Sequence, residues 1–297
     1  MNGFLCLNKP GGVTSFLAVA KARRIVGEKK AGHSGTLDPM ATGVLLVAFG
    51  KATRFLPLLP DHDKQYRAQF QLGITTDTLD STGTVLSQAD VQVFADQVAA
   101  VLPRFTGVIR QVPPMYSALQ KDGVRLYTLA RQGIEVEREA RTVTIHTLAL
   151  VAADDAAHRY TIDVSCSAGT YIRSLIADIG DALGTGAVMT ALCRTGACGC
   201  GLTNSVTLET LEGLRNSGRL NEAILPTDAL LPFDRLTVTA AQARRFGNGG
   251  ELDLARVRGV TDDGPYRVYA PDGGFLGVGT ADLAANILRV TKVFQQQ

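Results

Sequence analysis

Residues 32–43, with the sequence GHSGTLDPMATG, hold the densest group of side chains able to do chemistry. Three glycines in this segment give its backbone access to conformations that other residues avoid. Asp38 stands before Pro39, which biases the backbone of Asp38 toward extended geometry. A carboxylate on such a shaped loop suits a nucleophile or a general base, whereas the simpler alternative is an aspartate that caps a turn.

Apolar and polar patterns predict the elements that position this loop. Residues 43–50 (GVLLVAFG) form an apolar run between two glycines, which indicates a buried strand. Residues 65–72 (QYRAQFQL) alternate, which indicates a second strand with one buried face. Further strands are predicted at residues 4–7, 141–150 and 159–166, and helices at residues 15–26, 88–102, 123–133, 170–182 and 208–216. Residues 27–40 and 107–122 are predicted to be loops.

The end of the chain has a different pattern. Pro226 and Pro232 bracket a possible boundary near residues 230–235. Beyond it, short strands separated by Asp-Gly and Gly-Gly turns are predicted at residues 251–260, 264–270 and 274–278. We therefore expect an α+β protein with a mostly antiparallel mixed sheet flanked by helices. Residues 1–230 would form the main domain, and residues 231–297 a small β-rich C-terminal domain.

Charge and hydropathy limit the possible locations and partners. The net charge is +2, but residues 1–67 hold ten Lys and Arg against four Asp and Glu. This basic part could meet phosphates, or it could be a solvated helix. No apolar run is long enough for a transmembrane helix, and the N-terminus lacks the pattern of a secretory signal. The expected location is the cytoplasm, without a membrane partner.

The cysteines give no sign of a metal site or of a disulfide framework. The count is odd, and no second cysteine pair or histidine cluster accompanies the closest two. All five are expected to be reduced thiols: Cys6, Cys166, Cys193, Cys198 and Cys200.

The segment GHSGTLDPMATGVLLV resembles the catalytic segment of the bacterial tRNA pseudouridine synthase B family, which modifies uridine 55 in the T-loop of tRNA. Five other segments resemble the same family in the same order. They are LNKPGGVTS (7–15), GKATRF (50–55), DKQYRAQFQLGITTDTLDSTG (63–83), QVPPMYSALQKDGVRLYTLAR (111–131) and CSAGTYIRSLIADIG (166–180). The resemblance covers roughly residues 3–230 and implies a pseudouridine synthase-like fold.

The resemblance implies a role for each matching residue. Asp38 corresponds to the catalytic aspartate, Arg173 to an arginine that pairs with it, and Tyr66 to a tyrosine that packs against the target base. An arginine beside the carboxylate would favour its charged form and orient it by a bidentate contact. Without the resemblance, Tyr66 would be an ordinary core residue, and Arg173 could pair with an acid on its own helix.

Three further residues would bind the substrate. The resemblance implies that Tyr171 and Leu192 line the uridine pocket, although the segment around Leu192 matches more loosely. His33 corresponds to a histidine that contacts RNA near the flipped nucleotide, because a base must leave its stack before an enzyme can rebuild it. On the residues alone, Tyr171 would belong to the core and His33 to a polar loop.

The resemblance also implies partners. The substrate would be the T-arm of tRNA, and no cofactor, metal or obligate protein partner is implied; we expect a monomer. Residues 107–131 would form a finger that grips the RNA, stiffened by two prolines, and the C-terminal domain would be an RNA-binding accessory. Phosphate contacts are expected from Lys9, Lys21, Arg23, Arg24, Lys29 and Lys30.

Two other functions remain open from the sequence. One is an RNA-binding protein or tRNA-folding chaperone without catalytic activity. The other is a metal-dependent phosphohydrolase that uses Asp38 with Asp77 and Asp80. We expect Asp77 and Asp80 to cap turns instead, since no His or Glu accompanies them.

Overall fold

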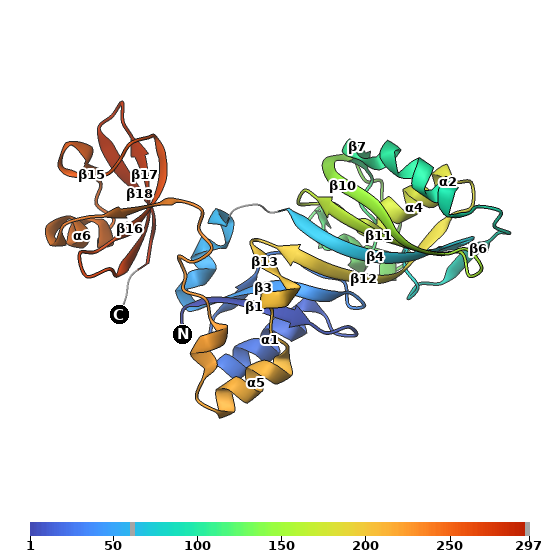
Figure 1. The fold of residues 1–297 in the computed structure, drawn as a ribbon, viewed down its shortest axis with the longest axis horizontal. Helices are drawn as coiled ribbons and strands as arrows, with labels where there is room; N and C mark the ends of the chain where they lie inside the picture. Colours follow the sequence, from blue (N-terminus) through green and yellow to red (C-terminus); the bar gives the residue numbers. More distant parts are fainter. Residues whose placement is uncertain (60–62, 295–297) are drawn as a thin grey trace.

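The computed structural model describes residues 1–59 and 63–294, and its largest element is a nine-stranded sheet (Figure 1). Its strands are β1 (Gly3–Lys9), β2 (Ala31–His33), β3 (Thr42–Phe49), β4 (Lys64–Leu72), β7 (Gly107–Gln111), β10 (Arg141–Asp154), β11 (Arg159–Cys166), β12 (Ala187–Ala197) and β13 (Cys200–Gly201). They are ordered β1-β3-β12-β4-β11-β10-β7, with β2 beside β3 and β13 beside β12. The pair β12 and β3 is parallel and the other pairs of this sheet are antiparallel, which confirms the predicted mixed sheet.

The chain also contains helices and small hairpins. The α-helices are α1 (Ser15–Val26), α2 (Ala95–Val101), α3 (Leu126–Arg131), α4 (Ile172–Ala182), α5 (Leu208–Asn216) and α6 (Ala240–Gly247). The 3-10 helices are η1 (Gly50–Leu58), η2 (Leu102–Phe105), η3 (Leu202–Asn204), η4 (Leu220–Ala223) and η5 (Leu254–Arg256). Two hairpins pair β5 (Ile74–Thr76) with β6 (Val85–Gln88), and β8 (Gln120–Lys121) with β9 (Val124–Arg125). Among the residues described, no helix has the length and apolar character needed to cross a bilayer.

The apolar run of β3 is buried on both faces of the sheet. Leu45, Val47 and Phe49 belong to one core, together with helices α1 and α4, while the alternate residues Val44 and Leu46 belong to a second core. A strand covered on both sides needs no polar positions, which explains the predicted continuous pattern. The loop that carries Asp38 runs directly into this strand, so its C-terminal end has a rigid anchor.

Strand β4 shows the alternation expected of a strand with one buried face. Tyr66, Ala68, Phe70 and Leu72 are buried, whereas most residues between them are exposed. Phe70 packs against Tyr160 of β11, with ring centroids 5.7 Å apart. The pleat thus places Tyr66 on the face of the sheet that packs in the same core as Leu45 and Val47.

The C-terminal part forms a second sheet of five strands: β14 (Asp234–Thr237), β15 (Leu252–Asp253), β16 (Gly264–Tyr269), β17 (Phe275–Asp282) and β18 (Ile287–Val293). In Figure 1 it lies at one end of the molecule, opposite β6 and α2. It is attached through aromatic packing, since the ring of Phe55 in η1 lies 5.6 Å from that of Phe275 and 6.1 Å from that of Phe294. The second core is therefore shared between the two sheets.

Several predicted elements differ from the structure. Strands β12, β14 and β18 and helix α6 were not predicted. The predicted loop at residues 27–40 contains β2, and the predicted loop at residues 107–122 contains β7 and β8. The predicted helix at 88–102 is helical only in α2 and the start of η2, and the predicted helix at 123–133 only in α3. The predicted strand at 251–260 is the two-residue β15 followed by η5. In contrast, α1, with Thr14 as its cap, and α5 and β11 have the predicted bounds.

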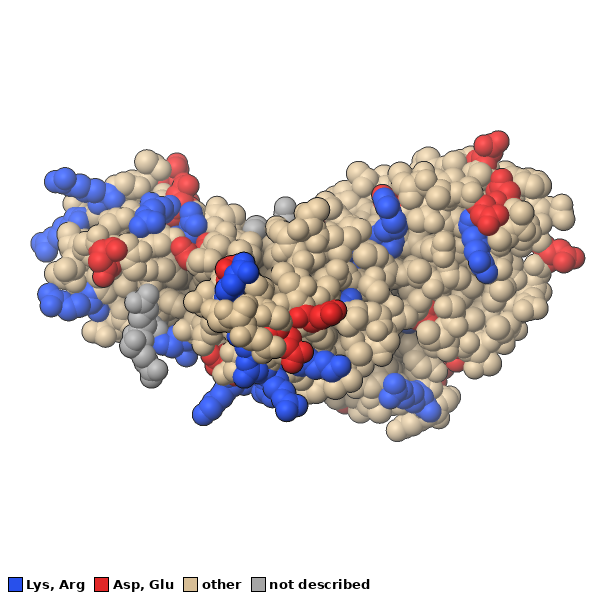
Figure 2. Space-filling view, turned by 60° about the horizontal axis from the view of Figure 1, so that its bottom comes forward, with Lys and Arg blue, Asp and Glu red and all other residues tan. Residues whose placement is uncertain are grey.

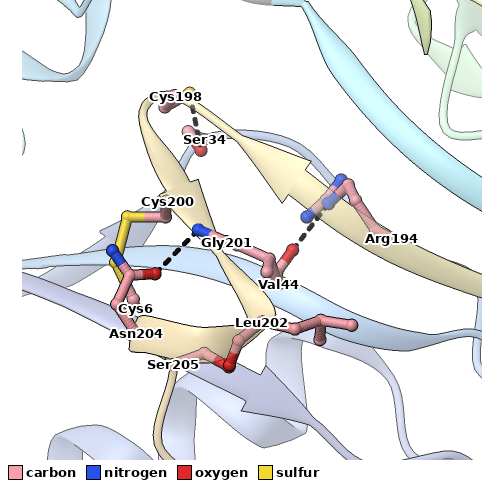
Figure 3. The surroundings of a disulfide bond; sticks show 10 residues. All are labelled: Cys6, Ser34, Val44, Arg194, Cys198, Cys200, Gly201, Leu202, Asn204 and Ser205. Atoms are coloured by element: carbon pink, nitrogen blue, oxygen red, sulfur yellow. Dashed lines mark hydrogen bonds between the residues drawn. A yellow bond between two sulfur atoms is a disulfide. The ribbon is translucent and has the colours of Figure 1, made fainter.

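The expectation of five reduced thiols is wrong for two of the cysteines. Cys6 of β1 and Cys200 of β13 form a disulfide between residues 194 positions apart (Figure 3). Both cysteines lie in the second core. Strand β1 pairs with β3 and β13 pairs with β12, so the fold brings the two cysteines together, although no local sequence signal indicates it. Cys166, Cys193 and Cys198 are free, and the thiol of Cys198 lies 3.4 Å from the hydroxyl of Ser34.

Candidate active site

The loop that carries Asp38 is fixed by two residues from other elements. Ser15, the first residue of α1, bonds both backbone groups of Leu37: its hydroxyl accepts from the amide at 2.8 Å and donates to the carbonyl at 3.0 Å. On the other side, Lys9 of β1 donates to the carbonyl of Pro39 at 3.3 Å. These contacts immediately before and after Asp38 hold its backbone in place, as a preorganised site requires.

The prediction that Lys9 contacts phosphates is wrong. The side chain of Lys9 is fully buried and also donates to the carbonyls of Pro10 and Val13, at 2.8 and 2.7 Å. Burial lowers the pKa of Lys9 to about 8. Lys9 therefore stabilises the loop that carries Asp38 through hydrogen bonds to backbone carbonyls. Its ammonium is not available to a nucleic acid.

Arg173 forms the predicted bidentate contact with Asp38. Its Nε lies 2.9 Å from Oδ2 of the carboxylate, and its Nη2 lies 3.1 Å from Oδ1. The guanidinium also donates to the carbonyls of Thr78 at 2.9 Å and Tyr116 at 2.8 Å, and only 5% of the Arg173 side chain is exposed. The guanidinium is thus fixed by three residues, so it orients the carboxylate of Asp38 rigidly.

Asp38 itself is open to the pocket, with 31% of its side chain exposed. Burial of the rest raises the pKa of the carboxyl above its ordinary value. The Arg173 guanidinium acts in the opposite, predicted direction, but its effect is the smaller of the two; Asp80 adds to the rise and Lys9 opposes it. The balance leaves a more basic carboxylate than a surface aspartate, which suits a nucleophile or a base.

A pocket of about 310 Å³ opens in front of Asp38. Tyr66 from β4, Leu192 from β12, and Tyr171 and Arg173 at the start of α4 all line it. Burial raises the pKa of Tyr66 to about 12, so its hydroxyl stays protonated at neutral pH. Five of the six residues predicted for the site therefore meet around one cavity.

His33 is the predicted site residue that does not line this pocket. It ends β2, and its Nδ1 accepts from the amide of Gly35 at 3.3 Å. Burial lowers the pKa of His33, which favours the neutral imidazole. The structure places it near the Gly35 turn, at the edge of the loop that carries Asp38.

Asp77 and Asp80 cap turns, as expected. Oδ1 of Asp77 accepts from the amide of Thr84 at 2.7 Å, and Oδ1 of Asp80 accepts from the amide of Thr82 at 3.0 Å. Asp80 also lies 3.8 Å from Arg173, so it contributes to the charge around the site. Within residues 1–59 and 63–294, no three His, Cys, Asp or Glu side chains gather as metal ligands.

Two buried residues near the pocket were missed in the sequence. Arg194 of β12 is fully buried, and its guanidinium donates to the carbonyl of Val44 at 2.6 Å (Figure 3). It also donates to the carbonyl of Gly35 at 3.2 Å. It thereby joins β12 to β3 and to the turn before Asp38. Gln111, at the end of β7, is also buried and bonds to Tyr171. Gln111 begins the segment 111–131 that resembles the family, and Arg194 lies near Leu192, where the match is looser. A polar side chain alone gives no sign that it will be buried.

The remaining basic residues predicted to meet phosphates lie on the surface. Figure 2 shows Lys and Arg side chains on the C-terminal domain and grouped on the middle of one face. Those that are exposed in α1 and the turn after it are Lys21, Arg23, Arg24, Lys29 and Lys30. Exposed cations of this kind are available to a polyanion.

Comparison with known proteins decides the family. Residues 23–172 match the family model described as TruB family pseudouridylate synthase (N terminal domain), and residues 173–232 match the tRNA pseudouridylate synthase B C-terminal domain. The chain belongs to the TruB family. The tRNA pseudouridine synthase B of Dechloromonas aromatica is 50% identical over 280 residues, covering 94% of this chain and 91% of the relative. That of Burkholderia mallei is 46% identical over 285 residues, covering 95% and 93%.

Solved structures agree with the TruB assignment. A chain of a Cbf5-Nop10-Gar1 complex superposes with a TM-score of 0.73 at 27% identity, covering 99% of this chain and 85% of that one. A chain of an H/ACA RNP bound to a substrate RNA containing 2'-deoxyuridine gives 0.72 at 26% identity, with the same coverage. As a TruB protein, the chain is a tRNA pseudouridine synthase, an isomerase that converts uridine to pseudouridine. This excludes the phosphohydrolase and the purely RNA-binding alternatives as its main function.

Proposed function

We propose that this TruB enzyme modifies uridine 55 in the T-loop of tRNA, with Asp38 as the catalytic carboxylate. The observation that carries the proposal is the bidentate Arg173–Asp38 pair at the wall of a pocket large enough for a nucleoside. A carboxylate oriented in this way, and partly open to the cavity, can attack the sugar or remove a proton from it. Uracil is then detached, turned and rejoined through carbon.

The pocket walls have complementary tasks in this proposal. A uridine inside a folded loop must first leave its stack to reach Asp38. Tyr66 would then stack on the extruded uracil, an interaction that stabilises a base by roughly 1–3 kcal/mol. Tyr171 and Leu192 would exclude water from the reacting atoms, and His33, beside the pocket, would contact the RNA near the extruded nucleotide. The reaction needs neither redox chemistry nor an external energy source, so we propose no cofactor or metal.

The RNA would be held by surfaces outside the pocket. We propose that residues 107–131 grip the T-loop, because the backbone of this segment reaches the site at Tyr116. Exposed basic residues of α1 and the C-terminal residues 231–297 would contact the rest of the T-arm, whereas residues 1–230 would carry the catalysis. We expect a cytoplasmic monomer without a protein partner; light scattering of the purified protein tests the monomer.

The test is release of tritium from tRNA labelled at uracil carbon 5. The variant Asp38→Asn is nearly isosteric but uncharged, and we expect it to lose turnover while tRNA affinity changes little. Asp90→Asn, at an exposed aspartate outside the pocket, is the matched control and should behave as wild type. Substantial turnover by Asp38→Asn would exclude the role of Asp38. A tRNA with cytidine at position 55 should release no tritium; release at another uridine would refute the position.

A further inference from the structure

A buried side-chain amide joins the gripping segment, residues 107–131, to the start of α4. Gln111 is the last residue of β7 and is only 2% exposed. Its Oε1 accepts from the backbone amide of Tyr171 at 2.8 Å, and its Nε2 donates to the carbonyl of Tyr171 at 3.0 Å. Both ends of the side chain are therefore satisfied by one residue, which fixes the backbone of Tyr171 relative to β7.

Tyr171 is the residue from which α4 begins. Its own side chain does not cap the helix, and its backbone is extended, with φ −105° and ψ 109°. The Gln111 side chain bonds only the backbone of Tyr171, and so it fixes the residue at which the helix begins. Arg173 follows two residues later, so a displacement of Tyr171 also displaces the guanidinium that holds Asp38.

Two further contacts tie the same segment to α4. The hydroxyl of Ser174 donates to the carbonyl of Val112 at 3.0 Å, and Nη2 of Arg173 donates to the carbonyl of Tyr116 at 2.8 Å. That same Nη2 also donates to Oδ1 of Asp38. One nitrogen therefore links the backbone of Tyr116 to the carboxylate of Asp38.

We propose that Gln111 is a positioning residue that couples the gripping segment to catalysis. It holds Tyr171, and thereby sets the fork of Arg173 against Asp38. RNA bound by residues 107–131 would be sensed at the active site through this connection. The inference rests on the proposed roles of Asp38 and of the gripping segment, and it assigns to Gln111 no contact with the substrate.

The first test replaces the amide by an apolar chain of similar length. Gln111→Met removes both bonds to Tyr171, and Gln88→Met, at an exposed glutamine of β6, is the matched control. We expect the single-turnover rate on T-loop RNA to fall about 10- to 100-fold, as for a small misplacement of a catalytic group. RNA affinity should stay within about threefold of wild type, because phosphate contacts dominate it.

The pH profile separates positioning from simple loss of stability. The charged groups that influence Asp38 are Arg173 of α4, Asp80 after β5, and Lys9 of β1. If Gln111→Met loosens Arg173, the charged form of the Asp38 carboxylate is less stabilised. The acidic limb of the pH–rate profile should then move to higher pH. A variant that merely unfolds more easily would lose active enzyme without moving this limb.

A second variant protects the test against misfolding. Gln111→Glu can still accept from the amide of Tyr171, but it can donate to the carbonyl only when its carboxyl is protonated. We therefore expect its rate to fall again at high pH, giving a bell-shaped profile where wild type reaches a plateau. Agreement of this profile with wild type would overturn the inference, even if Gln111→Met does not fold.

The two proposals fail in different ways. If both Gln111 variants match wild type in rate and acid limb while Asp38→Asn is inactive, the coupling is wrong and the catalytic assignment stands. If Asp38→Asn remains active, the proposed function itself is wrong, whatever Gln111 does. A rate loss in Gln111→Met that is explained fully by a smaller folded fraction, together with a wild-type pH profile for Gln111→Glu, would also overturn the positioning role.

Discussion

Replacing Arg173 by lysine keeps the positive charge but removes the planar fork. In the structure, the guanidinium reaches both oxygens of Asp38 and the carbonyls of Thr78 and Tyr116, all within 3.1 Å. The ammonium of Arg173→Lys is a point donor on a differently shaped chain and cannot occupy three nitrogen positions at once. At best it keeps one contact to the carboxylate and leaves a carbonyl without its donor.

The size of the effect follows from these contacts. A hydrogen bond to a charged group contributes about 1.5–3 kcal/mol, and a buried acceptor left without its donor costs about 1–3 kcal/mol. We therefore expect Arg173→Lys to lower the free energy of unfolding by roughly 2–4 kcal/mol. If a loss of the same size applies to the transition state, the rate falls by roughly 30- to 1,000-fold, since about 1.4 kcal/mol corresponds to a factor of ten.

The assay is the single-turnover rate with saturating tRNA, measured together with thermal unfolding. Arg67→Lys provides the matched control, because Arg67 also makes a bidentate contact, with Asp163 at 2.7 Å for both pairs of atoms, but on an exposed surface. This control should leave both measurements unchanged, since exposed ion pairs contribute little. A near wild-type rate for Arg173→Lys would refute the argument that the fork orients Asp38.

Three other perturbations have definite expected outcomes. Gly43→Ala should lower the unfolding temperature sharply, because Gly43 has φ +99° and a Cβ there would lie 2.2 Å from a β12 carbonyl; Gly213→Ala, in open space on α5, should not. The rate should fall as pH decreases through a midpoint above 3.8, because the pKa of Asp38 is raised and its ionised form is the proposed catalytic form; a lower midpoint contradicts this. The double variant Lys29→Ala, Lys30→Ala should weaken tRNA binding. It should also reduce the slope of log K for binding against log salt concentration by about 1–2 in magnitude; an unchanged slope places both lysines away from the RNA.

The residues that line the candidate site were easier to predict than the fold around them. Six ordered segments identified Asp38, Arg173 and Tyr66, and the structure brings all three to one pocket. Simple periodicity was enough for β3 and β4, because one is buried on both faces and the other on one face. In both strands the pattern of buried side chains is regular, so each strand can be predicted from its own residues alone.

Strand β12 shows why other parts could not be predicted. Its pairing with β4 is interrupted twice, between Met189 and Ala191 and between Arg194 and Gly196, and each irregularity breaks the alternation of buried side chains. The burial of Lys9 was missed for a related reason. One of its acceptors, the carbonyl of Pro39, is 30 residues away, and no local pattern signals such a distant partner.

The position of β12 has a consequence for synthesis on the ribosome. This strand lies between β3 and β4, although it is made more than a hundred residues after either of them. Until residue 197 has left the exit tunnel, the nascent chain has two unpaired edges at the centre of its future sheet. We therefore expect the pocket in front of Asp38 to form late in translation, and truncated chains to depend on chaperones that shield these edges.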